Sequence, residues 1–377
     1  MMKKVLFATT ALIATASMAA AEVRISGYGR FGLGYSSGSD AIGATGGYPY
    51  NDTVVGESST FIVSRLRLQF DMSTETDGGV ALGARVRAEA DGDFGDRTGV
   101  GGSQGPTAGQ NNPQVPLWSA PRFYATFGGF TLGVGNIIGA LEGTPGLYLE
   151  TRAAGAGLDG MQFVSAVTNV NNEYFNWDYF DSDGNGFNGV EAMYSAGAFA
   201  AHISYTSQNG NAANPTLPTP APVSSGAIYA PNRERAAVNL SYRFGDWRAA
   251  IGFQDSNYRF EDKTLVTLSG KLGQFGVRVA YADNDGVDKF GLYGNMDIGA
   301  ASNVVAWVTS EDAVSAADVA AGRNDNRDSV AASNQQEGTS YGINYSYDLG
   351  GGASFEAGVQ RSSYGNTQVQ AGAVFSF

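Results

Sequence analysis

Apolar and polar residues alternate in many short segments of this chain. In Val23–Leu33, for instance, the odd positions carry apolar residues or glycine, whereas the even positions from Arg24 to Arg30 are polar. Successive side chains of a β-strand point to opposite sides, so each such segment predicts a strand with one apolar and one polar face. The alternation is weakest in Val190–Ser195 and Ser302–Val308.

Sixteen segments follow this pattern. They are Val23–Leu33, Ile62–Phe70, Val80–Glu89, Arg122–Phe127, Phe130–Gly135, Val190–Ser195, Phe199–Thr206, Arg235–Phe244, Trp247–Gln254, Thr264–Leu272, Phe275–Tyr281, Phe290–Ile298, Ser302–Val308, Tyr341–Leu349, Ser354–Arg361 and Thr367–Phe377. Their connections alternate between short glycine-containing turns and long polar loops. The five longest loops span 36–59, 91–120, 136–189, 207–232 and 309–340. Short turns at one rim and long loops at the other are typical of a transmembrane barrel, with the short turns on the periplasmic side.

The predicted fold class is therefore all-β, a 16-stranded antiparallel transmembrane β-barrel. Lipid cannot hydrogen-bond peptide groups, so a β-protein that crosses a membrane must close on itself. A barrel of this size leaves a water-filled channel. A soluble sandwich or β-solenoid is the alternative. It would have to bury Arg65, Arg67, Arg85 and Arg87 together, which soluble cores avoid.

The two ends of the chain favour export and barrel closure. Lys3 and Lys4 precede the short apolar stretch Val5–Ala16 and three alanines at 19–21, which predicts a signal peptide over residues 1–21. A membrane anchor is the alternative, but the apolar run is shorter than the ~20 residues of a spanning helix. No later stretch is a candidate membrane helix, so residues 22–377 are expected to form one barrel domain. Its last strand, ending on Phe377, is expected to pair with the first.

Composition narrows the function. The chain has 53 Gly, 19 Tyr, 21 Phe and no Cys, and its net charge of −13 argues against nucleic acid as a partner. His202 is the only histidine, so a Cys–His pair is excluded and a Ser–His–Asp triad would need this one residue. Alternation places His202 on the polar face of its strand. We interpret it as a lumen or rim residue and expect no enzymatic activity.

Several segments together resemble the general diffusion porins of alphaproteobacteria. They are ISGYGRFGL at 25–33, SRLRL at 64–68, TETDGG at 74–79, GARVR at 83–87 and FGGFTLGVGN at 127–136, with the terminal Phe377. The resemblance implies a homotrimer in the bacterial outer membrane, reached through the periplasm. It also implies a third loop, residues 136–189, folded into the pore as a constriction. The expected partners are outer-membrane lipid, lipopolysaccharide, and small hydrophilic solutes and ions.

A group of arginines is predicted to line one wall of the channel. The polar faces of the first three strands carry Arg30, Arg65, Arg67, Arg85 and Arg87. Neighbouring strands are ~4.8 Å apart, so these side chains would form a dense basic strip. Charges that line a pore set its ion preference. The alternative is that the arginines pair locally with Asp71 or Glu89.

The third loop is predicted to set acids opposite this strip. Glu142, Glu150 and Asp159 are the acidic residues nearest its first end, and together with the arginines they would form the pore constriction. The alternative is a solvated outer loop.

A second feature of the same loop is a candidate calcium site. Asp181, Asp183 and Asn185 have the spacing that begins a calcium-binding loop, with Gly186 after them. The closing Glu is missing, because position twelve is Ala192 and Glu191 lies one place earlier. The alternative is an Asx-rich turn. No other cofactor is expected.

The predicted function is passive diffusion of small hydrophilic solutes and ions through an outer-membrane channel. A substrate-selective channel of the same fold and a structural or adhesive surface barrel are the alternatives. A selective channel needs an aromatic path or a defined binding group. Tyr28 and Tyr124 are predicted to face inward, and two tyrosines do not make such a path.

Overall fold

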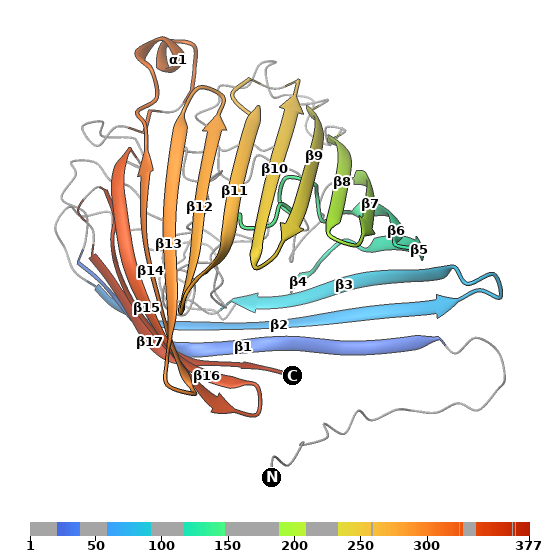
Figure 1. Ribbon diagram of the computed structural model, residues 1–377, viewed down its shortest axis with the longest axis horizontal. Helices are drawn as coiled ribbons and strands as arrows, with labels where there is room; N and C mark the ends of the chain where they lie inside the picture. The colour runs from blue at the N-terminus through green and yellow to red at the C-terminus, as the bar shows by residue number, and fades with distance from the viewer. Residues whose placement is uncertain are drawn as a thin grey trace.

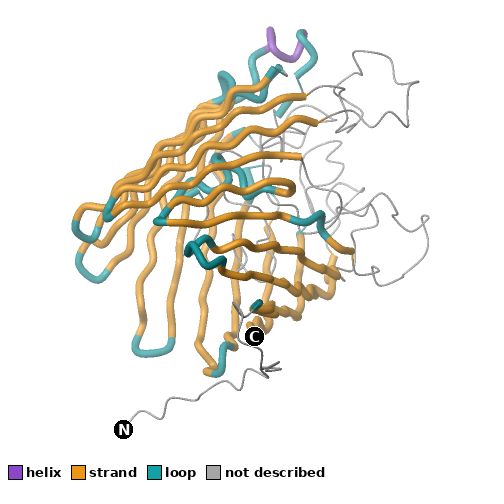
Figure 2. The backbone as a smooth tube through the Cα atoms, turned by 90° about the vertical axis from the view of Figure 1, so that its right-hand side faces the viewer, coloured by secondary structure: helices purple, strands orange, loops and turns teal. Residues whose placement is uncertain are grey.

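The structure is a computed structural model. It describes residues 21–37, 59–91, 117–147, 188–208, 233–257, 259–323, 325–326, 337–363, 365 and 367–377. The described strands form one antiparallel sheet that closes on itself, because the first strand pairs with the last. Strands β9 to β14 stand side by side in one wall (Figure 1). The turns that join β9 to β10, β11 to β12 and β13 to β14 lie at the rim away from the helix α1 (Figure 1). Figure 2 shows short turns at this rim and the helix at the other end.

The elements have the following bounds. The strands are β1 Glu22–Ser36, β2 Ser59–Glu75, β3 Ala81–Asp91, β4 Leu117–Trp118, β5 Arg122–Phe127, β6 Phe130–Asn136, β7 Asn188–Ala196, β8 Phe199–Gln208, β9 Arg233–Phe244, β10 Trp247–Ser256, β11 Lys263–Leu272, β12 Phe275–Asn284, β13 Asp288–Ile298, β14 Ser302–Glu311, β15 Gly338–Gly350, β16 Ala353–Arg361 and β17 Thr367–Ser376. The helix α1 spans Ala316–Ala320. All sixteen predicted strands are confirmed, several of them longer than the alternation indicated.

The additional strand, β4, belongs to the same barrel strand as β5. Both pair with β3, with Trp118 opposite Ala88 and Arg122 opposite Arg85. The break between them contains Pro121, which has no N–H to donate to a ladder. The carbonyl of Pro121 instead accepts from the N–H of Asn136 at 3.0 Å. The barrel therefore has sixteen strands around its circumference, one of them interrupted.

The two chain ends of the sheet are joined at Phe377. The N–H of Gly27 donates to the carbonyl of Phe377 at 2.9 Å, and the N–H of Phe377 donates back at 3.1 Å. Gly29 gives space to the neighbouring ring, since a Cβ there would lie 2.4 Å from Cζ of Phe375. The expectation that the last strand closes against the first is confirmed.

The two faces of the barrel have opposite polarity. Large apolar side chains of the outer face, such as Ile25 and Leu33, remain exposed, whereas Arg30 on the inner face of the same strand is buried. The inner faces of β9 and β17 likewise bury Arg235, Gln368 and Gln370. An apolar exterior around a polar interior suits a barrel whose outer surface meets lipid. Among the residues described, no helix has the length and apolar character needed to cross a membrane.

Candidate functional site: the inner wall of the barrel

The five predicted arginines lie together on the inner wall of β1, β2 and β3. Arg30 is opposite Arg65 in the register of β1 and β2. Arg67 is opposite Glu89, and Arg85 is opposite Asp71, in the register of β2 and β3. Side chains of one face repeat every second residue, so Arg87 joins them on β3. The structure thus brings the whole group together.

Local carboxylates pair with three of these arginines. Glu89, which is 7% exposed, forms ion pairs with both Arg65 and Arg67. Oδ1 of Asp71 accepts from Nε of Arg85 at 2.6 Å. Arg87 donates to Gln69, with 2.9 Å between Nε and Oε1. The local pairing weighed as an alternative is therefore present, and it coexists with placement on the channel wall.

The first part of the third loop turns inward along the opposite side of the barrel. Residues 137–147 are mostly buried, with Ile137, Leu141 and Leu147 each at most 1% exposed. The N–H of Ala140 donates to Oγ of Ser204 at 2.8 Å. Ser204 faces the lumen from β8, so this stretch follows the inside of the wall. We call residues 137–147 the inner segment.

Further hydrogen bonds extend this path across the next strands. Nδ2 of Asn239 on β9 donates to the carbonyl of Ala140 at 2.5 Å. Oγ1 of Thr267 on β11 donates to the carbonyl of Pro145 at 2.6 Å. The inner segment therefore crosses the interior side of β8 to β11.

An apolar patch on the inner wall contacts the inner segment. Its buried members, which form one cluster with Ala140, Leu141 and Leu147, are Ala237, Leu265, Ala280, Ala282, Tyr293, Val305 and Trp307. These residues come from β9 and β11 to β14. Apolar side chains facing a water-filled lumen are unfavourable unless something covers them. Here the loop covers part of that surface, and burial of both partners stabilises the inner segment on the wall.

Glu191 on β7 fixes the start of the inner segment. Its Oε2 accepts from the N–H of Ile138 at 3.1 Å and from the N–H of Gly139 at 3.2 Å. Nε of Arg122 donates to Oε1 at 2.6 Å, and Nε2 of His202 lies 2.9 Å from Oε2. At 1% exposed, the Glu191 carboxylate is removed from solvent, and these four contacts satisfy its oxygens.

The sequence did not single out Glu191 as an anchor. Its only signal was an acidic residue on the polar face of a strand, close in sequence to the end of the third loop. His202 does lie on the inner wall, where alternation placed it, and its contact with Glu191 gives it a structural role.

Comparison with known proteins decides the family of this barrel. Residues 8–367 match the family described as Gram-negative porin. The chain belongs to this family. A curated porin from Fuscovulum blasticum is 25% identical over 374 residues, covering 94% of this chain and all of that one. The protein is thus a porin, a channel of the outer membrane and not an enzyme.

Solved structures of one porin share the fold. A triple mutant of the Rhodopseudomonas blastica porin matches with a TM-score of 0.63 at 23% identity, covering 94% of this chain and all of that one. Another mutant of the same protein matches with a TM-score of 0.64 at 22% identity and the same coverage. At this identity the likeness concerns the fold, and the fold is the predicted sixteen-stranded barrel.

Most of the predicted acidic and calcium residues of the porin fall outside the described part of the chain. Glu142 belongs to the inner segment and is partly buried. Glu150 and Asp159 lie outside the described residues, as do Asp181, Asp183 and Asn185. Within the described ranges, no three His, Cys, Asp or Glu side chains are grouped in a way that could hold a metal ion.

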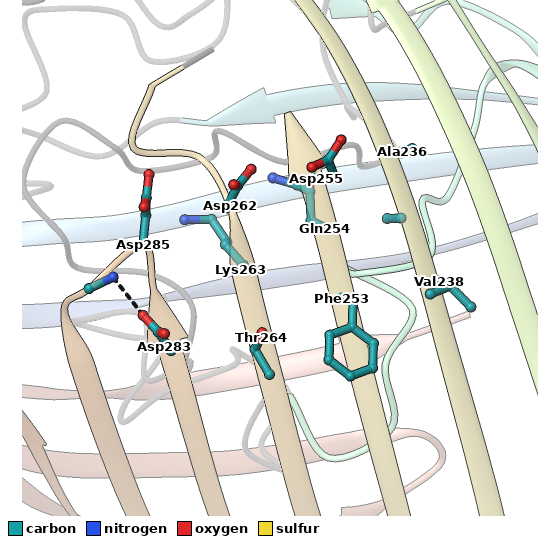
Figure 3. A pocket seen from close by; sticks show the side chains of 12 residues that line it. Ala236, Val238, Phe253, Gln254, Asp255, Asp262, Lys263, Thr264, Asp283 and Asp285 are labelled. Carbon is teal, nitrogen blue, oxygen red and sulfur yellow. Dashed lines mark hydrogen bonds between the residues drawn. The ribbon is translucent and has the colours of Figure 1, made fainter. Parts of the chain in front are cut away.

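An acidic hollow lies at the loop-side ends of β9 to β12. It has a volume of about 570 Å³, and Figure 3 shows Asp255, Asp262 and Asp285 around it with Lys263. Asp283 is fixed by the N–H of Gly286, which donates to its Oδ1 at 2.6 Å. Burial raises the pKa of Asp285, an effect opposed by the positive charge of Arg323. The hollow lies at the rim, at the loop end of the barrel, away from the arginines of β1 to β3.

Proposed function

We propose that the inner segment and the basic strip of Arg30, Arg65, Arg67, Arg85 and Arg87 flank the narrowest part of a passive diffusion channel. The observation that carries this proposal is the docking of residues 137–147 on the inside of the wall. A loop held there reduces the cross-section that solutes can use. The strip is built on strands, so its charges are held in place relative to the pore.

The acids of the third loop complete the proposed constriction. Glu142 begins this group within the inner segment, and Glu150 and Asp159 follow further along the loop. Carboxylates on one side and guanidiniums on the other would create a field across the pore. Such a field orders water and dipolar solutes and disfavours apolar ones, so small hydrophilic solutes and ions would pass down their gradients. Calcium bound by Asp181, Asp183 and Asn185 belongs to the same proposal.

The proposal also covers the cellular setting. A signal peptide over residues 1–21 would direct export through the periplasm. The apolar exterior would contact outer-membrane lipid and lipopolysaccharide. A homotrimer is supported by the family resemblance and would bury part of that exterior between copies.

Planar-bilayer recording on the purified mature chain tests the channel itself. We expect stepwise conductance in KCl, with steps in groups of three if the porin is trimeric. Vesicle swelling with sugars of increasing size would then measure the size limit. Reconstituted protein that gives no conductance would overturn the proposal.

A further inference from the structure

A second group of cations lies on the inner wall, on the side away from β1 to β3. Arg243 on β9 is opposite Arg248 on β10, Arg248 is opposite Ser269 on β11, and Ser269 is opposite Arg278 on β12. The three arginines therefore belong to one continuous row across four strands. We call Arg243, Arg248 and Arg278 the periplasmic basic row.

The side chains of this row point into the barrel. Tyr242 and Phe244, which flank Arg243, stack on the outer face with ring centroids 6.5 Å apart. Trp247, next to Arg248, places its ring over Gly270, where a Cβ would lie 2.4 Å from Cδ2. Val279, next to Arg278, is 48% exposed on the outside. Because neighbours in a strand face opposite sides, all three arginines face the lumen.

The row lies close to the rim formed by the hairpin turns. The turn at 245–246 separates Phe244 from Trp247, so Arg243 and Arg248 are each one residue away from the residues that flank the turn. Short turns of outer-membrane barrels are on the periplasmic side. The periplasmic basic row therefore lies at the inner mouth of the channel.

The arginines at the turn end of this row differ from those of the basic strip in the groups that they contact. Arg65, Arg67 and Arg85 each have a carboxylate partner. Within the ranges that the structure describes, neither Arg243 nor Arg248 forms an ion pair. Nη2 of Arg248 donates to Oγ of Ser241 at 3.2 Å, a neutral partner. Like charges directly opposite on neighbouring strands repel, so an anion between them would be stabilising.

The surroundings supply further donors. Ser241 and Ser269 lie on the same inner face, between or beside the arginines. Lys271 is two residues beyond Ser269 on that face and adds another cation. Two carboxylates are close by in the fold: Asp246 lies in the turn between Arg243 and Arg248, and Asp297 on β13 has an Oδ1 that accepts from Nδ2 of Asn303 at 2.7 Å. The row thus combines guanidinium forks with hydroxyl groups, the donor set that suits a phosphate or another oxyanion.

We propose that the periplasmic basic row is a binding site for small polyvalent oxyanions, with inorganic phosphate as the model ligand. The proposal deepens the proposed diffusion function and rests on it, since binding at the row affects transport only if the barrel conducts. This binding site would concentrate oxyanions at one mouth of the channel. Its effect would depend on the side from which the anion arrives.

Single-channel recording tests the proposal with inorganic phosphate. The mature porin is inserted in one orientation in KCl, and phosphate is added to one side at a time. We expect phosphate to reduce the wild-type current at lower concentration from the short-turn side than from the loop side. In the double variant Arg243→Gln with Arg248→Gln, the concentration needed should rise at least about ten-fold, which equals about 1.4 kcal/mol of binding free energy.

Two further variants keep the test decisive. Arg361→Gln removes an arginine from the outer face of β16 and should leave the phosphate response at the wild-type level. Arg248→Lys keeps the charge and should retain most of the response even if the double variant folds poorly. This inference alone would be overturned if the wild type conducts but its current does not respond to phosphate. An equal response to phosphate from both sides would also overturn it. A wild type without conductance would instead overturn the channel proposal.

Discussion

Arg122 and Glu191 are 69 residues apart in the sequence, yet Nε of Arg122 donates to Oε1 of Glu191 at 2.6 Å inside the barrel. The pair bridges β5 and β7 across Gly133 on the intervening strand β6. Both side chains are at least nine-tenths buried. The carboxylate that accepts from Arg122 also holds the start of the inner segment, so this pair links the wall of β5 to β7 to the loop inside the pore.

Replacement of Glu191 by Ala should release the inner segment. The N–H groups of Ile138 and Gly139 lose their acceptor, and Arg122 becomes a buried charge without its partner. Breaking a buried ion pair costs about 3–5 kcal/mol. We expect a lower unfolding temperature, larger conductance and more current noise. The matched control, Ser204→Ala, removes one hydrogen bond to Ala140, worth about 1 kcal/mol, and should change conductance less. Equal conductance in wild type and Glu191→Ala would show that Glu191 does not hold the loop.

Gly133 is required for the approach of Arg122 to Glu191. A Cβ at this position would lie 2.6 Å from Oε1 of Glu191 and 3.2 Å from Nη2 of Arg122. We expect Gly133→Ala to destabilise the barrel by about 1–3 kcal/mol, since added volume displaces packed groups. Gly294→Ala is the control, because a Cβ there meets only the carbonyl of Gly276 at 3.9 Å. Thermal unfolding in detergent compares the two. A similar fall in unfolding temperature in both variants would mean that replacing any strand glycine destabilises the barrel, whether or not it lies at this contact.

Neutral replacements in the basic strip should alter ion preference. The double variant Arg65→Gln with Arg67→Gln removes two positive charges and leaves Glu89 without these partners. We expect the reversal potential in a KCl gradient to shift toward cation preference. Adding Glu89→Gln removes the remaining negative charge and should bring the potential part of the way back. An unchanged reversal potential in the double variant would place Arg65 and Arg67 away from the constriction.

Asp285, at the loop-side rim, should make the stability of the protein depend on pH. Burial raises the pKa of this carboxyl, so folding favours its protonated form. Stability from this group is present at low pH and is lost as the pH rises through the raised pKa. Asp285→Asn stays neutral and keeps a residue type that tolerates the observed φ of 53°. The variant should be more stable than wild type at neutral pH, with the difference vanishing in acid. Unfolding temperatures across that pH range provide the check, and a difference independent of pH would contradict it.

The alternation of residues predicted which side chains face the lumen, but it did not predict that a loop covers part of the inner wall. Val305 and Trp307 lie on the inner face of β14 beside outward-facing Val308, so apolar residues occupy both faces. This explains why alternation was weak over Ser302–Val308. The inner face there belongs to the apolar patch that contacts the inner segment. β4 was missed for a simpler reason: two residues are too few to show a period.

The strands, their two faces and the position of the arginines on the inner wall could all be predicted from the order of the amino acids. These features depend on local backbone geometry, in which every second side chain shares a face. Three relationships could not be predicted in this way: the contact of Glu191 with Arg122, the docking of residues 137–147 on β8 to β11, and the shared row of Arg243, Arg248 and Arg278. Those relationships depend on strand register and on the path of a loop, which are set by contacts between residues distant in the chain.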